Sequence, residues 1–542
     1  MRKRSILLLA GALAITASLV VGPAATAGPE RASAGTVVFI HDQEPPNLNG
    51  NFVGNGLYAT FLVVNNIFYG GQIRDDKANW VTRLFTGPPK LVKKSPLTTS
   101  FTFSPKASWS DGKPVTCADW KATWQVYINP ANNVITRTGY EDIQSVTCKG
   151  KTGTVVFKKV FANWETLLNT SVYPAHVIAG QDMNKMFQDS ISVSSGPWKF
   201  ASWQKGVQIT VVKNPKYTIA PMKLDRVVFR YIADTNARFQ AMKAGEGQVM
   251  EPQAQLQIAD FQNDPNFVVK SSAGFSFEHL DIQFGAKGHA ALKAPYVRQA
   301  LITGINRPQI AQALYQTIAP GLPTLQNLIF KTFEDGYEKH FNRYPFSQAK
   351  VISILKGKGC TGGPDKPSAG NSDIFSCPGV GKLSFRFSTT AGNQLRALTF
   401  EVVQRQLKSV GIELVARFQP AGLLFGTTLP SGDWDIIMFT WVLDPTSKIT
   451  SKDTYACGGE QNYGNYCNRK ATALLEKTAT ELDSATRTKL LNQADVLMAK
   501  DVPSIPMYVR PVFVISAAKT KGLTVPTTQE GSPWNANTWT TS

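Results

Sequence analysis

Signatures of catalysis and of nucleic-acid binding are missing from this chain. The serine-nucleophile pattern GxSxG and the zinc-peptidase pattern HExxH do not occur, and only five of the 542 residues are histidine. Basic residues are spread along the chain without an arginine-rich arm, zinc-finger spacing or an RNA-binding motif. No internal repeat of solenoid length is present. These absences argue against a hydrolase, a nucleic-acid-binding protein and a repeat protein.

Long apolar runs are also scarce. The conspicuous one, residues 6–21, follows the basic residues Arg2, Lys3 and Arg4 and precedes a small-residue cleavage pattern, Ala25-Thr26-Ala27. This order predicts a signal peptide over residues 1–27; the alternative, a membrane anchor, needs a longer apolar run. The first cysteine is Cys117, so we expect no lipid anchor on an N-terminal cysteine. We expect an exported protein of the periplasm or of the cell-envelope exterior.

Acidic residues are few compared with basic ones. The chain has 38 Asp and Glu against 57 Lys and Arg, a formal net charge of +19, to which the signal peptide contributes three basic residues. A solvated basic surface explains this excess, and attraction to an anionic wall, membrane surface or ligand is the functional alternative. The part after position 27 is too long for one hydrophobic core, so we expect two or three lobes.

Cysteine is limited to six residues, which form three couples close in sequence. In an exported protein these suggest disulfides, and pairing between neighbours is the simplest connectivity, although the sequence does not fix it. Metal binding is the competing interpretation; without a CxxC motif and with scattered histidines we expect no metal site. The couples are Cys117 and Cys148, Cys360 and Cys377, and Cys457 and Cys467.

Strand and helix patterns alternate along the whole chain, which predicts α/β lobes with helix-covered sheets. Expected strands are 36–40, 412–417, 434–441 and 507–515, expected helices are 57–67, 295–304 and 395–410, and expected N-caps are Thr116, Asn306, Asn468 and Ser484.

The most distinctive stretch is residues 194–249, where a Gly-Pro turn, short strands, an Asn-Pro break, an apolar strand and a capped helix follow in order. The chain resembles the family 5 extracellular solute-binding proteins, the peptide- and nickel-binding receptors of ABC importers. This stretch departs from the family pattern at Trp198, in place of Tyr, and at Gln248, in place of Asp. Further matching strings are 44–49 (EPPNLN), 109–116 (WSDGKPVT) with Asp119, 173–176 (YPAH), 297–301 (VRQAL) with 305–307 (INR), and 501–506 (DVPSIP).

The resemblance implies a two-lobed clamp of the periplasmic-binding-protein type (class II) with an extra third domain. Lobe I would be discontinuous and would consist of residues 35–70, 193–278 and 503–542. The extra domain would take residues 71–192, and lobe II residues 279–502.

The resemblance also implies where a ligand is held. Peptide-binding members place an acid from a W-x-x-D string against the ligand amine, and Trp441 and Asp444 keep that spacing. Asp444 would be the amine clamp; alternatively it caps the turn at Pro445. Trp434 lies an odd number of residues from Trp441 on the predicted strand, so the two should face opposite sides, with Trp441 toward the ligand or in the core. Further candidates, each with a scaffold alternative, are Phe284, Asn462 and Tyr463.

The function implied is that of a receptor, not an enzyme. It would capture a ligand, most simply an oligopeptide, and deliver it to a membrane permease, acting as a monomer without a cofactor. A wall-associated binding or sensor protein without an importer is the first alternative, because no lipid anchor is evident. A secreted hydrolase is the second; the acid pair Asp433 and Asp435 would share a strand face.

Overall fold

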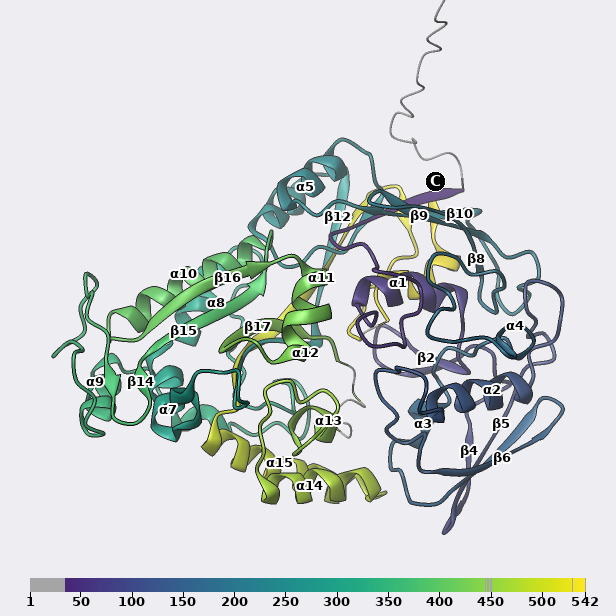
Figure 1. Cartoon of the computed structure of the whole chain (residues 1–542). Coiled ribbons are helices and arrows are strands. Elements are labelled where there is room, and N and C mark those ends of the chain that lie inside the picture. Colours follow the sequence, from purple (N-terminus) through teal and green to yellow (C-terminus); the bar gives the residue numbers. More distant parts are fainter. Residues whose placement is uncertain (1–34, 444, 446–447, 449–450, 529, 542) are drawn as a thin grey trace, which may run out of the picture. The chain divides into compact units, whose positions relative to one another are not determined.

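A computed structural model describes residues 35–541 except 444, 446–447, 449–450 and 529 (Figure 1). The predicted signal peptide and Asp444 therefore lie outside the described residues. The described residues belong to one compact unit. In the part of the chain that the structure describes, no helix is both long and apolar enough to cross a membrane.

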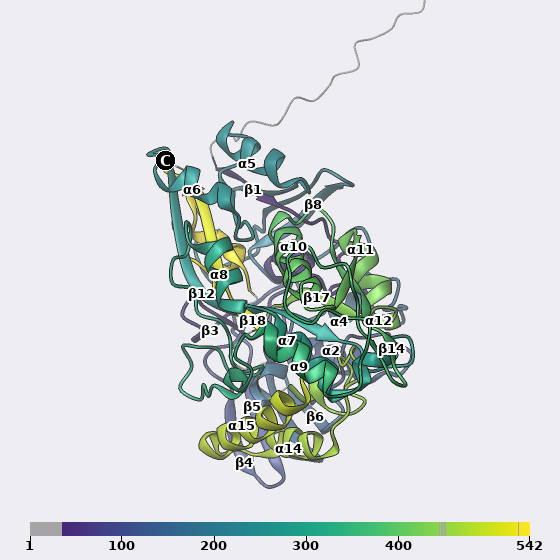
Figure 2. The ribbon, with the colours of Figure 1, turned by 90° about the vertical axis from the view of Figure 1, so that its left-hand side faces the viewer.

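A ten-stranded sheet joins the two ends of the chain with its middle. Its two long central strands, the 16-residue β12 and the 14-residue β18, pair antiparallel and lie side by side (Figure 2). At about 3.3 Å per residue β12 is roughly 50 Å long, enough to extend through both halves of the sheet. The order is β16 (Glu413–Gln419), β15 (Ser384–Thr390), β17 (Ile436–Trp441), β12 (Phe267–Ile282), β18 (Ser504–Ala517), β11 (Val249–Met250), β1 (Thr36–His41), β10 (Arg226–Tyr231), β9 (Gln208–Lys213) and β8 (Trp198–Gln204).

Two hydrophobic cores pack against this sheet, and β1 contributes to both. β1 pairs parallel with β10 and β11; Val37 and Phe39 pack with α1 in a first core that also includes α2 and β5, whereas Val38 and Ile40 belong to the second core. β15 pairs parallel with β16 and β17, and their inward side chains pack with α7, α8, α10 and α15. The predicted boundary between residues 278 and 279 falls inside the continuous strand β12, and the division into lobes stays a prediction.

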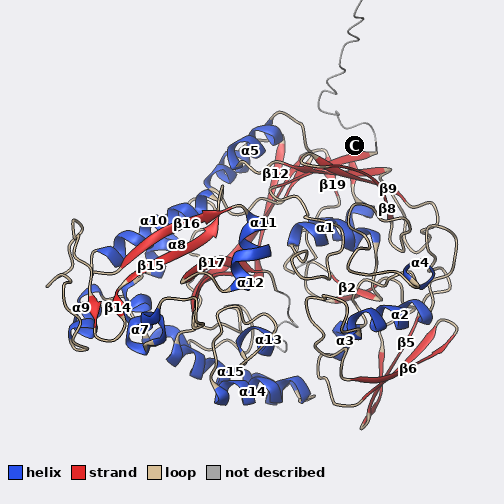
Figure 3. Ribbon diagram, viewed as in Figure 1, coloured by secondary structure: helices blue, strands red, loops and turns tan. Residues whose placement is uncertain are grey.

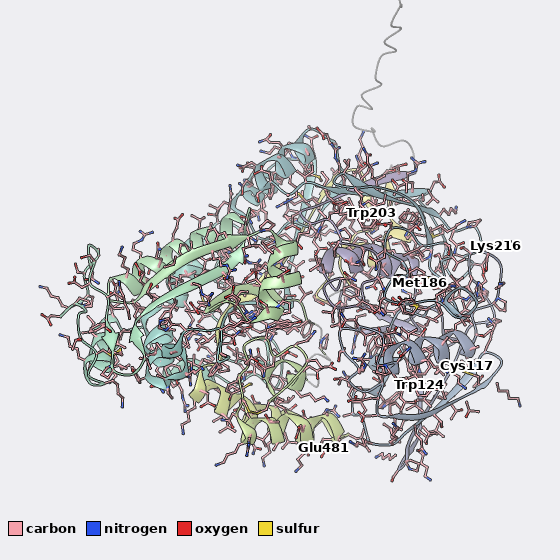
Figure 4. The ribbon with its side chains drawn as sticks, viewed as in Figure 1. Cys117, Trp124, Met186, Trp203, Lys216 and Glu481 are labelled. Carbon is pink, nitrogen blue, oxygen red and sulfur yellow. A yellow bond between two sulfur atoms is a disulfide. The ribbon has the colours of Figure 1, made fainter. Side chains whose placement is uncertain are left out.

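Residues 71–192 contain a four-stranded antiparallel sheet, β4 (Lys90–Lys94), β5 (Leu97–Thr102), β7 (Thr152–Phe157) and β6 (Ile143–Lys149), beside helix α2 (Figure 3). The expected capping box starts this helix: the backbone N–H of Thr116 donates to Asp119 at 2.8 Å. The Cys117–Cys148 disulfide ties the start of α2 to β6 (Cys117 is labelled in Figure 4).

The helices that the sequence predicted are present with small shifts of their ends. The prediction that Ser484 is the N-cap of its helix is wrong, because the helix already begins at Ser484. Asp483 is the N-cap, and its carboxylate accepts a hydrogen bond from the backbone N–H of Thr486 at 2.8 Å. The helices are α1 (Tyr58–Ile67), α2 (Cys117–Ile128), α3 (Trp164–Leu167), α4 (Ala175–Ile178), α5 (Thr235–Lys243), α6 (Ala259–Gln262), α7 (Pro295–Gly304), α8 (Arg307–Tyr315), α9 (Gln348–Lys356), α10 (Gln394–Lys408), α11 (Ala421–Leu423), α12 (Leu429–Ser431), α13 (Ser451–Tyr455), α14 (Arg469–Thr480) and α15 (Ser484–Asp501). The short strand pairs are β2 (Gln72–Arg74) with β3 (Trp80–Thr82), β13 (Ser376–Cys377) with β14 (Gly381–Lys382), and β19 (Thr520–Lys521) with β20 (Thr540–Thr541).

Candidate functional site

A cavity of about 880 Å³ is lined by residues from all three predicted parts of the fold. This volume lies within the range of pockets that enclose small organic ligands. Tyr58 on α1 and Arg510 on β18 come from predicted lobe I, Thr138 comes from the predicted extra domain, and Trp441 and Tyr463 come from predicted lobe II. A site assembled from such distant segments forms only when the whole chain has folded.

One wall of the cavity is aromatic. The ring of Trp441, at the end of β17, stacks between His279 (centroids 5.9 Å apart) and Tyr463 (6.4 Å), and Phe439 meets it edge-on at 5.0 Å. The Trp441 Nε1 is buried and has no hydrogen-bond acceptor among the described residues. The neighbouring rings fix the orientation of the indole. Its ring is suited to pack against an apolar part of a ligand, and its N–H is suited to donate to an acceptor on the ligand.

A second part of the lining carries carboxylates that already accept hydrogen bonds from other residues of the protein. Tyr58 donates its phenolic O–H to Glu251 at 2.5 Å, and Ser532 donates both its backbone N–H (2.8 Å) and its hydroxyl (2.6 Å) to the other oxygen of Glu251. Burial first, and then the Glu251 charge, raise the pKa of Tyr58 well above its usual value. Nearby, Gln253 donates to Asp42 at 2.7 Å.

Lys331 and Arg396 are two of the buried basic residues of the lining. The Lys331 Nζ donates to the carbonyl of Ile329 at 3.1 Å and lies 4.0 Å from the centroid of the Phe277 ring. Burial lowers the pKa of Lys331 to about 7. The Arg396 guanidinium binds the Glu278 carboxylate at 3.0 Å with both side chains almost fully buried, and despite burial this charge lowers the pKa of Glu278.

Contacts close the cavity between the predicted extra domain and predicted lobe II. The Thr138 hydroxyl donates to Asp453 on α13 at 2.9 Å, and the backbone N–H of Arg137 donates to Glu460 at 3.3 Å. Burial raises the pKa of Asp453 to about 6, opposed by Lys452 and by the Thr138 hydrogen bond. These two hydrogen bonds join the predicted extra domain to predicted lobe II beside the cavity.

Three of the five predicted ligand-binding residues line the cavity: Trp441, Asn462 and Tyr463. The Asn462 side chain donates to the carbonyls of Ala456 (2.7 Å) and Tyr466 (2.6 Å), so it also shapes the loop closed by the Cys457–Cys467 disulfide. Any contact of these side chains with a ligand stays a prediction.

Phe284 is not a lining residue. Its ring packs edge-on against Tyr466, with centroids 5.5 Å apart, and lies 4.6 Å from the Arg298 guanidinium carbon. Asp444 lies outside the described residues.

The expected opposition of Trp434 and Trp441 is wrong. Trp434 is fully buried in a cluster with Leu429 and Phe439, and Trp441 packs against that same cluster. The reason is that β17 starts at Ile436, so Trp434 precedes the strand and strand alternation does not determine its direction. Trp441 lines the cavity and Trp434 does not.

Sequence reasoning missed most of the charged lining residues, among them Glu251, Lys331, Asp453 and Arg510. Arg510 could have been noticed, because it is a charged residue within the predicted apolar strand 507–515. A charged side chain that is buried needs a hydrogen-bond or ion-pair partner. Asp433 and Asp435, the considered acid pair, both bind Arg386, at 2.6 and 3.0 Å.

The six cysteines pair as neighbours in the structure, Cys117 with Cys148, Cys360 with Cys377 and Cys457 with Cys467, and none lines the cavity. Among the residues that the structure describes, no three His, Cys, Asp or Glu side chains are grouped closely enough to hold a metal ion. The Cys117–Cys148 disulfide joins α2 to β6, and the Cys457–Cys467 disulfide closes a short loop.

Comparison with known proteins identifies relatives over most of the chain. An oligopeptide-binding protein, OppA, of Mycobacterium tuberculosis is 24% identical over 85% of this chain and 78% of its own length. An ABC transporter peptide-binding protein of Brucella ovis is 27% identical over 75% of this chain and 73% of its own length.

Solved structures share the fold, a mixed α/β architecture with an extra domain. AppA of Bacillus subtilis, in complex with a nonapeptide, superposes with a TM-score of 0.83 at 21% identity, covering 95% of this chain and all of its own. NikZ of Campylobacter jejuni, in complex with Ni(L-His), gives 0.81 at 19% identity over 94% of this chain and all of its own.

Residues 88–463 match the profile of the bacterial extracellular solute-binding proteins, family 5. This match covers more than half of the chain. The chain therefore belongs to family 5 of the bacterial extracellular solute-binding proteins, the non-enzymatic ligand-binding components of ABC importers.

Proposed function

We propose that this protein captures an oligopeptide between two closing lobes and delivers it to the permease of an ABC importer. The observation that carries the proposal is the cavity of about 880 Å³ lined by residues from all three predicted parts. In this proposal residues 35–70, 193–278 and 503–542 form lobe I, 71–192 the extra domain and 279–502 lobe II. The strands β12 and β18 would then connect the lobes and act as the hinge.

The composition of the cavity favours a peptide. A peptide presents alternating amide donors and acceptors together with side chains, and the lining offers an aromatic wall beside paired charges of both signs. Trp441, Asn462 and Tyr463 would contact the ligand, and Asp444 would bind its amine. Relatives named as oligopeptide-binding and peptide-binding proteins support this choice.

Native mass spectrometry of the purified protein tests the proposal. We expect a bound mass that is released on unfolding and that sequences as one or more short peptides. Recovery of a non-peptide solute would overturn the peptide choice but keep the receptor. Turnover of a substrate panel by protein that retains no ligand would instead favour the secreted hydrolase.

The location and partner of the protein follow from the same proposal. An exported receptor needs a membrane permease to which it releases its ligand, and co-purification with membrane proteins from the native host tests that contact. A monomer is expected by size-exclusion chromatography with light scattering. Ligand retention without any permease contact would favour the wall-associated binding or sensor protein.

A further inference from the structure

The charged groups that line the cavity are not equally occupied by protein partners. Five of them are basic, namely Arg83, Lys331, Arg396, Lys448 and Arg510. For four of these the structure shows an acceptor within hydrogen-bonding distance. Arg83 donates to the hydroxyl of Tyr69 at 2.8 Å and to the carbonyl of Trp534 at 2.6 Å.

The other three occupied basic groups are held just as firmly. Arg396 is bound to Glu278, Lys448 is bound to Glu334, and Lys331 donates to backbone carbonyls. A ligand could compete for these donors only by replacing a partner inside the protein. They therefore contribute to the shape of the cavity more than to ligand recognition.

Arg510 differs from all four. It lies on β18 and is partly buried, and its side chain makes neither a hydrogen bond nor an ion pair with any described residue. Its Nε is fully buried without an acceptor. A guanidinium carries five N–H donors, and burying one of them without an acceptor is unfavourable.

The acidic groups of the lining do not supply the missing partner. Glu251 is occupied by Tyr58 and Ser532, Asp453 accepts from Thr138, and Asp42 accepts from Gln253. Arg510 acts on Asp42 only through space: burial opposes ionisation, but His41 and, more weakly, Arg510 help to lower the pKa of Asp42. Because no lining carboxylate among the described residues accepts a hydrogen bond from Arg510, its donors remain available to an acceptor on the ligand.

A second donor without an acceptor lines the same cavity as Arg510. Phe277 on β12 pairs with Trp441 on one side and with Val509, the neighbour of Arg510, on the other. Two strand spacings, about 10 Å, separate the backbones of these flanking residues. The buried Trp441 Nε1 also lacks an acceptor among the described residues. Both free groups are donors, so both require an acceptor from the ligand.

We propose that Arg510 binds a carboxylate of the ligand, with Trp441 donating to a second acceptor about two strands away. The planar fork of an arginine matches the two oxygens of a carboxylate. The inference rests on the proposed receptor function and narrows its substrate class to solutes with a free carboxylate. A peptide supplies this group at its C-terminus, and a small organic acid supplies the same chemistry without a peptide.

Matched ligand pools test the proposal. Protein stripped of ligand is offered a pool of tripeptides to hexapeptides with free C-terminal carboxylates and, separately, the same pool with C-terminal amides, and retained masses are measured. A third pool contains citrate, glutarate and histidine. The variants are Arg510→Met, Arg510→Lys, which keeps the charge but loses the fork, and Arg417→Met as a control. Arg417 binds Asp433 outside the cavity.

A second readout does not depend on tight binding. p-Hydroxyphenylglyoxal reacts with free guanidinium groups, and peptide mapping of the adducts reports each arginine separately. We expect Arg510 to react faster than the occupied Arg396, and a bound acid to suppress its reaction. Unfolding curves of each variant verify that loss of binding is not loss of fold.

We expect the protein to retain peptides with a free carboxylate but not the corresponding amides. Arg510→Met should weaken the affinity for these acids roughly 30-fold or more, Arg510→Lys should restore part of this affinity, and Arg417→Met should leave it unchanged. Equal retention of amides, or acid binding unaffected by Arg510→Met, overturns the inference while leaving the peptide receptor intact. Protection of Arg510 by the third pool alone upholds the carboxylate and rejects the peptide. If no acid in any pool is retained or protects Arg510, the carboxylate inference is wrong.

Discussion

Ligand binding is expected to weaken as pH rises through 6, because a buried carboxylate lies where the cavity closes. Asp453 accepts from Thr138 at 2.9 Å, and burial raises its pKa from 3.8 to about 6. If the lobes open, Asp453 meets water and its pKa returns toward the usual value near 3.9. The closed form therefore binds more protons than the open form between these two values.

The sign and size of the effect follow from this difference. A group whose pKa is raised on closure stabilises the closed form fully below about pH 3.9, and this stabilisation is lost as pH rises through about 6. Two pH units correspond to about 3 kcal/mol at the acidic limit. At pH 5, one unit below the closed-state value, closure is about tenfold more favourable than at pH 7.5. Glu460 and Glu141 contribute to the raised value and Lys452 opposes it.

The assay is calorimetric titration with the ligand recovered from the protein, at pH 5.0, 6.0 and 7.5. Asp453→Asn removes the titrating group but keeps a partner for Thr138, so the tenfold ratio should fall to near one. Dividing the wild-type affinity by the variant affinity at each pH cancels any effect of titration of the ligand itself. Asp433→Asn is the matched control, since Asp433 lies outside the cavity, bound to Arg386 and Arg417. An Asp453→Asn protein with the same pH dependence as wild type would refute the reasoning.

Three further outcomes are expected. Replacing Cys117 and Cys148 by Ser opens a loop of sequence separation 31, which in the chain-entropy description costs about 3.5 kcal/mol of stability; urea unfolding with an unchanged midpoint would contradict this. Arg396→Met leaves Glu278 buried without its partner and should cost about 3–5 kcal/mol in the same assay, with much of the loss recovered by adding Glu278→Gln. Asp444→Ala should weaken an amine-bearing ligand about tenfold or more, and calorimetry showing unchanged affinity would reject the amine clamp.

Local rules predicted the elements of the fold well. The capping box at Thr116 and Asp119 starts α2 as expected, and Asn306 and Asn468 accept from the first turns of α8 and α14. These features depend on residues a few positions apart, which the sequence places next to each other. The pairing of the cysteines with their neighbours in sequence is predictable for the same reason.

The cavity was far less predictable, because it depends on residues hundreds of positions apart. Glu251 meets Ser532, and Thr138 meets Asp453, only after the complete sheet has formed. Trp434 shows a second reason why the site was hard to predict. The alternation of side chains along a strand was assumed at Trp434, but the strand begins two residues later, at Ile436. Trp441 was found through its position in a family string, not through any physical signal of its own.

The strings that reveal the family have a structural explanation, since they pack against one another outside the cavity. Around the first core, His176 binds Asp111 at 2.8 Å, and the backbone N–H of Ser110 donates to the carbonyl of Ser194 at 2.8 Å. These two contacts join three of the strings. Around the second core, Arg298 donates to the carbonyl of Asp501 at 2.6 Å, joining two more.

None of the residues in these packed strings lines the cavity, in contrast to Trp441 of the W-x-x-D string. The residues that build the scaffold and those that face the ligand are therefore largely separate sets. A cavity side chain such as Arg510 can change without disturbing the contacts that hold the fold, because it makes no bond with them. The free guanidinium, and not the family strings, is consequently the feature through which this chain can be expected to select one solute over another.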